Sequence, residues 1–451
     1  MSAPRLVEDF FRHECGRLVA TLVGRVGVRH LDLVEDAAQA ALAQALDSWP
    51  RAGVPRNPSA WLYRVAHNTL LSVLRQRTAR RRLLERHAMP DLENAPDTPC
   101  ADDDDMHDDL LRMLFVCCDA RLPLPSQLVL ALKTLCGFDV REIASRLFLS
   151  EANVYKRLGR ARAQLRKAGR LDVDLSTAQV ISRLPAVLTV LYLLFTEGYL
   201  SSRADSAIRR ELCAEAIRLV TLLATHPVGR DPETFALLAL MHFHTARLTS
   251  RQDADGGLLL LEEQDRANWD QREIQEGMVW LARSSHGNVF SRYHAEAAIA
   301  AEHCLAPTFA ATRWDRVAEC YAMLERLTAS PIHRLNRAVA IAEWKGSDAG
   351  LTVLEGFAPP TWLVESYMWA AVLADLHRRR GDMETASGFL SAARALAPNK
   401  ATSALLDRRA QFTCSSKRGS TEGVPVHDPL SARSPEHLLN DATRRARGVR
   451  R

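Results

Sequence analysis

The chain has 451 residues, of which 25% are charged, and its formal net charge is +5 at pH 7. This length exceeds what one hydrophobic core usually organises, so we expect several domains. The nine cysteines form no CxxC pair and the longest apolar run, Leu184 to Phe195, falls short of the ~18 residues of a membrane span, which argues against secreted and membrane proteins.

The first informative segment covers residues 57–87 and reads NPSAWLYRVAHNTLLSVLRQRTARRRLLERH. It combines an apolar helical face with a dense series of arginines. Aromatic rings beside cations suit single-stranded nucleic acid, because unpaired bases stack on the rings and phosphates pair with the cations. Alternatively, Trp61 is simply a core residue.

An acidic segment follows, from Asp91 to Asp109, and it contains no lysine or arginine. Such a block repels itself, so we expect a disordered linker between two domains. A soluble spacer is its simplest role.

Residues 137–167 read GFDVREIASRLFLSEANVYKRLGRARAQLRK, which predicts a helix, a tight turn and a basic second helix. The first helix, 140–147, buries Ile143, Ala144 and Leu147. Ser150 is placed to cap the second helix. A solvated basic face is the alternative, but the turn and the capping serine favour a DNA reader. The second helix turns Val154, Leu158, Ala161 and Leu165 inward, and Lys156, Arg157, Arg160, Arg162, Arg166 and Lys167 outward.

Two nucleic-acid-facing elements on either side of an acidic linker resemble the bacterial RNA polymerase sigma factors of the extracytoplasmic-function class. The resemblance covers residues 5–170. In that family one helix binds the polymerase clamp, the next melts the minus-10 promoter element, and the helix-turn-helix reads the minus-35 element. The segment LVEDAAQAALAQALDSWP matches the polymerase-binding helix. The resemblance also places the acidic linker in the path of nucleic acid through the polymerase.

Residue roles follow from this resemblance. Ala40, Ser72 and Asp119 stand where the family usually has an acidic residue, an aspartate and a histidine. The expected contacts are Asp36 and Gln39 with the beta and beta-prime subunits of the polymerase core, Trp61, Arg64, Asn68, Arg75 and Arg77 with the minus-10 strand, and Ser150, Asn153, Lys156, Arg157, Arg160 and Arg162 with the minus-35 duplex.

Residues 176–410 are rich in alanine and leucine with helical periodicity, so we expect this half to be all-helical. The segment YMWAAVLADLHRRRGDMETASGFLSAARALAPN has the small and large positions of a tetratricopeptide repeat, and Gly346 lies 35 positions (381 minus 346) before Gly381. Stacked helix pairs commonly form a concave surface, which suggests a peptide or protein partner.

Three blocks in this half depart from a plain repeat: YLLFTEGYL, DADGGLLLLEEQDRANWD and SPIHRLNRAVAIAE. With the first two domains they resemble the sigma-factor group that carries a long C-terminal helical extension, and Thr196 replaces the usual asparagine. The charged residues of these blocks either form a buried ionic network that pins helices together or line a ligand groove. They are Glu197, Asp265, Arg266 and Arg337.

The sequence therefore predicts an all-α, cytoplasmic DNA-binding protein that is not an enzyme and needs no metal or cofactor. We expect the extension to regulate the promoter-binding domains in cis. The alternatives are a one-component helix-turn-helix regulator with a sensing domain and an enzyme fused to a DNA-binding module. The expected domains are 1–80 (region 2), 81–109 (linker), 110–172 (region 4), 173–410 (tetratricopeptide-like extension) and 411–451 (disordered tail).

Overall fold

A computed structural model describes residues 3–84, 103–147, 149–167, 175–201, 208–253, 257–287, 289–328, 330–397 and 402–408. Within these ranges the regular elements are helices, and one isolated bridge joins Gln252 and Leu258, so the expected all-α class is confirmed. The chain forms two compact units. The first contains residues 1–144 and 149–190, and the second contains residues 145–148 and 191–451.

The first unit opens with long helices that follow one another closely. Helix α2 packs on both α1 and α3, and four of its alanines are completely or almost completely buried, which lets the helices approach. Asn57 caps α3, since its Oδ1 accepts a hydrogen bond from the Ala60 N–H at 3.0 Å. The elements are α1 (Ala3–Val26), η1 (Val28–His30), α2 (Leu31–Ala52) and α3 (Pro58–Leu84).

The predicted helix-turn-helix is confirmed. Val154, Leu158, Ala161 and Leu165 of the second helix are buried as expected, and that helix packs on α5. Ser150 acts as the N-cap, because its Oγ accepts a hydrogen bond from the Asn153 N–H at 3.3 Å. The elements are α4 (Asp103–Cys117), α5 (Leu124–Thr134), α6 (Val140–Arg146) and α7 (Glu151–Lys167).

Helices extend into both ends of the predicted acidic linker. α3 continues to Leu84, and α4 begins at Asp103 within the run of aspartates. Carboxylates are favourable at a helix N-terminus, where they interact with the positive end of the dipole. Residues 85–102 of the linker and all of the predicted tail, 411–451, lie outside the described residues.

Helix α8 (Thr177–Tyr199) is the most apolar helix of the described chain that has the length of a membrane span, with a mean hydropathy of 1.7 over its most apolar window. The sequence analysis identified only the uninterrupted apolar run of this helix, Leu184 to Phe195, and not its full length. Core helices of globular proteins also have this length and composition, and 67% of the apolar window is buried within the structure. Two buried charged side chains, Arg183 and Glu197, lie on the same helix.

In the second unit most helices pack on their neighbours along the chain. α10 contacts α9, α11 and α12, and the series continues through α13, α14, α15 and α17 to α18. The elements are α9 (Arg210–Thr225), η2 (Pro227–Gly229), α10 (Pro232–Ala246), η3 (Leu248–Arg251), η4 (Arg266–Asn268), α11 (Gln271–Ser284), α12 (Arg292–Leu305), α13 (Trp314–Thr328), α14 (Pro331–Lys345), α15 (Ser347–Leu354), α16 (Thr361–Val364), α17 (Tyr367–Arg380) and α18 (Met383–Ala395).

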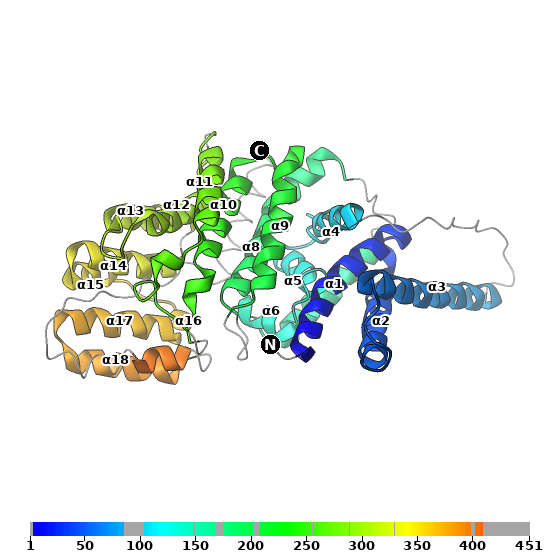
Figure 1. Ribbon diagram of the computed structural model, residues 1–451, viewed down its shortest axis with the longest axis horizontal. Coiled ribbons are helices and arrows are strands. Elements are labelled where there is room, and N and C mark those ends of the chain that lie inside the picture. The colour runs from blue at the N-terminus through cyan, green and yellow to red at the C-terminus, as the bar shows by residue number, and fades with distance from the viewer. Residues whose placement is uncertain are drawn as a thin grey trace. The chain divides into compact units, whose positions relative to one another are not determined.

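Two helix pairs in this series turn at glycines that both have a positive φ. Gly346 between α14 and α15 has φ 93°, and Gly381 between α17 and α18 has φ 92°. A positive φ favours glycine at the end of a helix, which explains why these positions recur in the sequence. Figure 1 shows α17 and α18 side by side as a hairpin. The tetratricopeptide assignment itself stays a prediction.

Candidate nucleic-acid interface

The first half of α7 gathers most of the residues predicted to read duplex DNA. Lys156 and Arg160 are exposed, and Arg157 donates from Nε to the Oδ1 of Asn153 at 3.1 Å. With about 100° of rotation per residue, the positions 153, 156, 157 and 160 fall within an arc of about 100°. This face can lie along a groove of duplex DNA. The hydrogen bond keeps the Asn153 amide and the Arg157 guanidinium side by side on it.

Arg162 does not belong to that face. It lies about half a turn of the helix away from Asn153 and forms ion pairs with Glu35 and Asp32 of α2. Arg166, on the same side, also pairs with Asp32. The structure therefore separates Arg162 from the other predicted minus-35 residues.

Glu35 is the centre of this contact between α7 and α2. It is buried, and one of its oxygens accepts a hydrogen bond from the Thr134 Oγ1 at 2.8 Å while the other pairs with Arg162. The pair Arg166–Asp32 is more exposed. Since buried charges are retained only with partners, we expect Glu35 to contribute most to holding α7 against α2.

The predicted polymerase-binding residues lie beside this contact. Asp36 and Gln39 are exposed and three residues apart, so they share one face of α2. Asp32 and Glu35 fall within the same arc of about 100°. One face of α2 thus carries the exposed Asp36 and Gln39 together with Asp32 and Glu35, which form ion pairs with α7.

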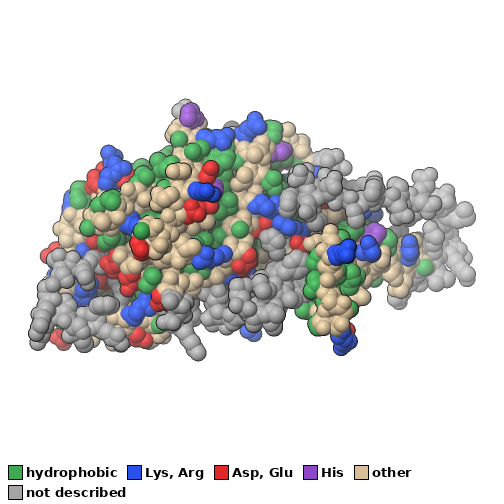
Figure 2. Space-filling model, in the orientation of Figure 1, with side chains coloured by type: hydrophobic (Ala, Val, Ile, Leu, Met, Phe, Trp, Pro, Cys, Tyr) green, Lys and Arg blue, Asp and Glu red, His purple; other side chains and the backbone are tan. Residues whose placement is uncertain are grey.

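Helix α3 presents an exposed cationic face. Arg64, Asn68 and Arg75 are exposed, and the helical repeat places them on the same side as Trp61, within about 60°. Arg77 is also exposed but lies roughly 140–200° away. On the side seen in Figure 2, Lys and Arg side chains gather over this helix.

Trp61 is half-buried, so part of its ring belongs to the core, and its contact with a base stays a prediction. Its ring packs edge-on against the buried Trp49, with centroids 5.6 Å apart. The remaining surface is available to a base. Near it, Tyr63 stacks on His67 at 5.6 Å and lies under the Arg25 guanidinium, which fixes the ring orientations along this part of α3.

The four charged residues predicted as a network in the extension have different partners. Glu197 pairs with Arg146 of α6, and Arg337 pairs with Glu325 at 2.7 Å. Asp265 caps the turn η4, and Arg266 donates to the backbone carbonyls of His303 and Ala306. Asp265 and Arg266 thus satisfy helix ends, whereas Glu197 and Arg337 belong to two separate ion pairs.

The described part of the block DADGGLLLLEEQDRANWD, residues 253 and 257–270, contains the turn η4 and ends at Trp269 and Asp270. The Trp269 ring is buried between the guanidinium groups of Arg247 and Arg266, at 5.4 and 4.6 Å from its centroid. Burial, followed by the charge of Arg247, lowers the pKa of Arg266 to about 10. Among the described residues, no group of three or more His, Cys, Asp or Glu side chains is placed to hold a metal ion.

Two important pairs were missed by sequence reasoning. Arg183 of α8 pairs with Asp119, and Arg146 of α6 pairs with Glu197. A signal existed for the first, since Asp119 replaces the histidine of the resembling family and Arg183 interrupts an apolar helix. Nothing in the local pattern of Arg146 distinguishes it from a solvated arginine.

Comparison with known families covers three parts of the chain. Residues 11–80 match Sigma-70 region 2, and residues 112–165 match Sigma-70 region 4. Residues 183–285 match a family of unknown function, DUF6596. The first two matches contain the candidate surfaces on α2, α3 and α7, and the third begins at Arg183.

An uncharacterized protein of Rhizobium meliloti (strain 1021) is 37% identical over 332 residues, which make up 72% of this chain and 78% of that protein. The similarity thus extends well beyond either Sigma-70 region. No solved structure matches the chain.

Proposed function

This chain belongs to the sigma-70 family of RNA polymerase sigma factors, which recognise promoters and initiate transcription, and we propose that it is an extracytoplasmic-function sigma factor controlled by its own helical extension. The observation that carries the proposal is that one chain presents three separate exposed faces, on α2, α3 and α7, within regions 2 and 4. Phosphoryl transfer then belongs to the polymerase. We place the protein in the cytoplasm, where polymerase and promoter DNA meet.

Each face has a role in the proposal. Asp36 and Gln39 of α2 bind the polymerase core through its beta and beta-prime subunits. The face of α3 with Trp61, Arg64, Asn68 and Arg75 binds the melted minus-10 strand, because it combines an accessible ring with cations. Arg77 lies on the other side of α3 and is assigned to a backbone phosphate near the minus-10 element.

The minus-35 duplex is assigned to the first half of α7. Asn153, Lys156, Arg157 and Arg160 share one face, with Ser150 fixing the start of the helix. An arginine held beside an asparagine is suited to hydrogen bonding with base edges in the major groove, and the two flanking cations are suited to phosphates. Arg162 is assigned to the contact with α2 instead.

The proposal is tested by mixing the full chain with RNA polymerase core and a pool of genomic promoters. We expect transcripts that require the protein and share a two-part promoter. Binding to duplex DNA without any core-dependent transcript would instead identify a one-component regulator. Hydrolysis of a substrate panel by the purified chain would favour the fused enzyme.

Control by the extension is the second part of the proposal, supported by the covalent attachment of the extension to a complete two-region reader. Comparing the full chain with the 1–172 fragment gives the sign of the effect, once circular dichroism has established that the fragment is folded. Identical output from both would contradict control in cis. A peptide or protein partner of the stacked helices stays a prediction, testable by cross-linking of the full chain.

A further inference from the structure

Helix α8 carries two buried charges that have partners in region 4. Arg183 is 5% exposed and Glu197 is 0% exposed, although both lie in the apolar part of the chain. They are 14 residues apart (197 minus 183), which corresponds to about 21 Å along the helix and to nearly the same side of it. A buried charge is tolerated only when it is paired and hydrogen-bonded, so both contacts are required by the fold.

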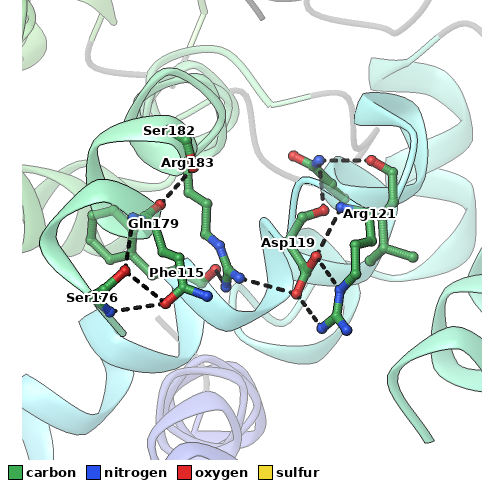
Figure 3. Close-up of polar contacts among 9 residues, drawn as sticks. Phe115, Asp119, Arg121, Ser176, Gln179, Ser182 and Arg183 are labelled. Carbon is green, nitrogen blue, oxygen red and sulfur yellow. Dashed lines mark hydrogen bonds and ion pairs between the residues drawn. The ribbon is translucent and has the colours of Figure 1, made fainter. Parts of the chain in front are cut away.

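The first contact joins Arg183 to the end of α4 (Figure 3). Its Nη1 donates to the carbonyl oxygen of Phe115 at 2.9 Å, and its Nη2 to the Oδ2 of Asp119 at 3.1 Å. Phe115 lies in the last turn of α4, where carbonyl groups lack partners within the helix. The guanidinium therefore satisfies a helix end and a buried carboxylate together.

Asp119 is held from two sides. It is 2% exposed and also accepts hydrogen bonds from Arg121 at 2.7 and 2.9 Å. Burial by itself raises the pKa of Asp119, but the hydrogen bonds from Arg121 and the charge of Arg183 outweigh it, and the pKa lies below the ordinary value. The carboxylate is thus charged under the conditions in which the protein works. It stands between α4 and α5, and α5 is the helix on which α7 packs.

The second contact joins Glu197 to the helix-turn-helix itself. Arg146, the last residue of α6, donates from Nε to the Oε2 of Glu197 at 3.0 Å and from Nη2 to the Leu200 carbonyl at 2.8 Å. The other oxygen of Glu197 accepts from the Ser201 Oγ at 2.9 Å. Arg146 lies four positions before Ser150, the N-cap of α7 (150 minus 146). The contact therefore sits at the turn that sets the direction of the DNA-reading helix.

The end of α8 is itself fixed by the loop that follows α10. Arg251 is buried, donates to the Tyr199 carbonyl and lies over the Tyr199 ring at 3.7 Å from its centroid. Cations are favourable at a helix C-terminus. At the C-terminus of α8, Arg146 donates to the Leu200 carbonyl and Arg251 to the Tyr199 carbonyl. Glu197 thus has a rigid setting, and Arg146 is held in one orientation.

We propose that Arg183 and Glu197 are positioning residues for promoter recognition: they fix the helix-turn-helix of region 4 to α8, so that the orientation of α7 on the minus-35 duplex depends on the extension. This inference rests on the proposed sigma function. Neither residue touches DNA. Their effect passes through Asp119 to α5 and through Arg146 to the α6–α7 turn, both of which support α7.

The test uses full-length Glu197→Gln and Arg183→Gln with RNA polymerase core and two promoters, one intact and one with a scrambled minus-35 element. We expect each variant to reduce transcription from the intact promoter about tenfold. The low transcription from the scrambled promoter and the affinity for core should not change. Equal loss from both promoters would mean a general folding defect and overturn the inference, as would no loss.

Glu325→Gln is the control within the extension. It makes the same substitution in an ion pair that joins α13 to α14, where Glu325 pairs with Arg337 and Arg334 and is 17% exposed, whereas Glu197 is 0% exposed. We expect it to keep the full minus-35 dependence. A loss of minus-35 dependence in this control would remove the specific role of Glu197.

A double-mutant cycle keeps the inference testable if the single variants are unstable. Because Glu197 and Arg146 act through one contact, Glu197→Gln with Arg146→Gln should be no worse than the more affected single variant. Independent, multiplying losses would contradict the contact as the cause. If the unaltered chain yields no core-dependent transcripts, the proposed function itself fails, whereas an active chain with insensitive variants refutes only this inference.

Discussion

Individual side chains on α7 divide by the side of the helix on which they lie. Arg157 shares the exposed face with Asn153, whereas Arg162 pairs with Glu35. Sequence reasoning recovered the apolar side of α7 completely and identified its cations. It could not separate Arg157 from Arg162, because that difference depends on α2, more than a hundred residues away in the chain.

We expect Arg157→Ala to weaken binding of holoenzyme to the minus-35 duplex by about 1–3 kcal/mol and to relax one base preference. If Arg157 instead contacts phosphate, the salt slope falls while the base preference stays. Fluorescence anisotropy with a series of substituted duplexes distinguishes the two. Arg162→Ala is the matched control and should retain every base preference, and an equal change in both variants would reject the division of faces.

Helix α3 allows the same kind of comparison. Arg64→Ala should reduce binding to a bubble template that is already open at the minus-10 element, because Arg64 lies on the side of Trp61. Arg77→Ala should have a smaller effect, since Arg77 lies on the far side. Binding of the two holoenzymes to single-stranded and duplex minus-10 oligonucleotides measures the difference. A larger loss with Arg77→Ala would place the melted strand on the opposite face.

The carboxyl of Asp119 makes a pH-dependent contribution to stability. Its pKa is lowered in the folded chain, so its contribution is complete above the ordinary aspartate value of about 3.9 and is lost as pH falls through the lower folded value. We expect Asp119→Asn to lower the free energy of unfolding by about 3 kcal/mol at neutral pH. Urea denaturation should find this difference shrinking in acid, and a difference that grows in acid would contradict the assignment.

Among the helices, α8 is the one whose role the sequence did not indicate. Its apolar run was recognised, and the all-helical class of this half was predicted correctly. The charged residues of the three unusual blocks were expected either to form one ionic network or to line a ligand groove, and in the structure they cap helix ends and form separate ion pairs. The partner of each charged side chain depends on which helix ends meet in the fold, and the local sequence pattern does not predict this.

Gly198 lies next to Glu197 at a close approach of α8 to α9. A Cβ at this position would come within 2.7 Å of the Cys213 backbone nitrogen and 2.8 Å of the Arg209 carbonyl oxygen. We expect Gly198→Ala to lower the free energy of unfolding by about 1–3 kcal/mol and to reduce minus-35 dependence together with stability. Gly388→Ala, in α18 with open space around it, is the control for thermal denaturation. Equal melting temperatures for both variants would argue against the close approach.

For the molecule as a whole, two-region recognition imposes a distance. The minus-10 and minus-35 elements are about 25 base pairs apart by their names, which is roughly 85 Å along B-DNA. In the structure α7 is ion-paired with α2, within region 2. A chain that binds both elements at once must therefore separate these helices.

The ion pairs between α2 and α7 thus oppose the separation of these helices, here called opening, and they do so less at high salt. Counterions weaken them and weaken phosphate contacts too, so opening and DNA binding respond to salt in opposite directions. The double variant Asp32→Asn, Glu35→Gln should bind promoter DNA more tightly than the unaltered holoenzyme at low salt, with the two converging at high salt. Asp47→Asn, which removes an exposed pair within α2, should change nothing, and parallel salt curves for all three proteins would mean that opening carries no electrostatic cost. When ions accumulate in the cell under osmotic stress, the ion pairs between α2 and α7 weaken while the affinity of the factor for DNA falls. These two effects oppose each other, so transcription from its promoters should change less than DNA affinity alone predicts.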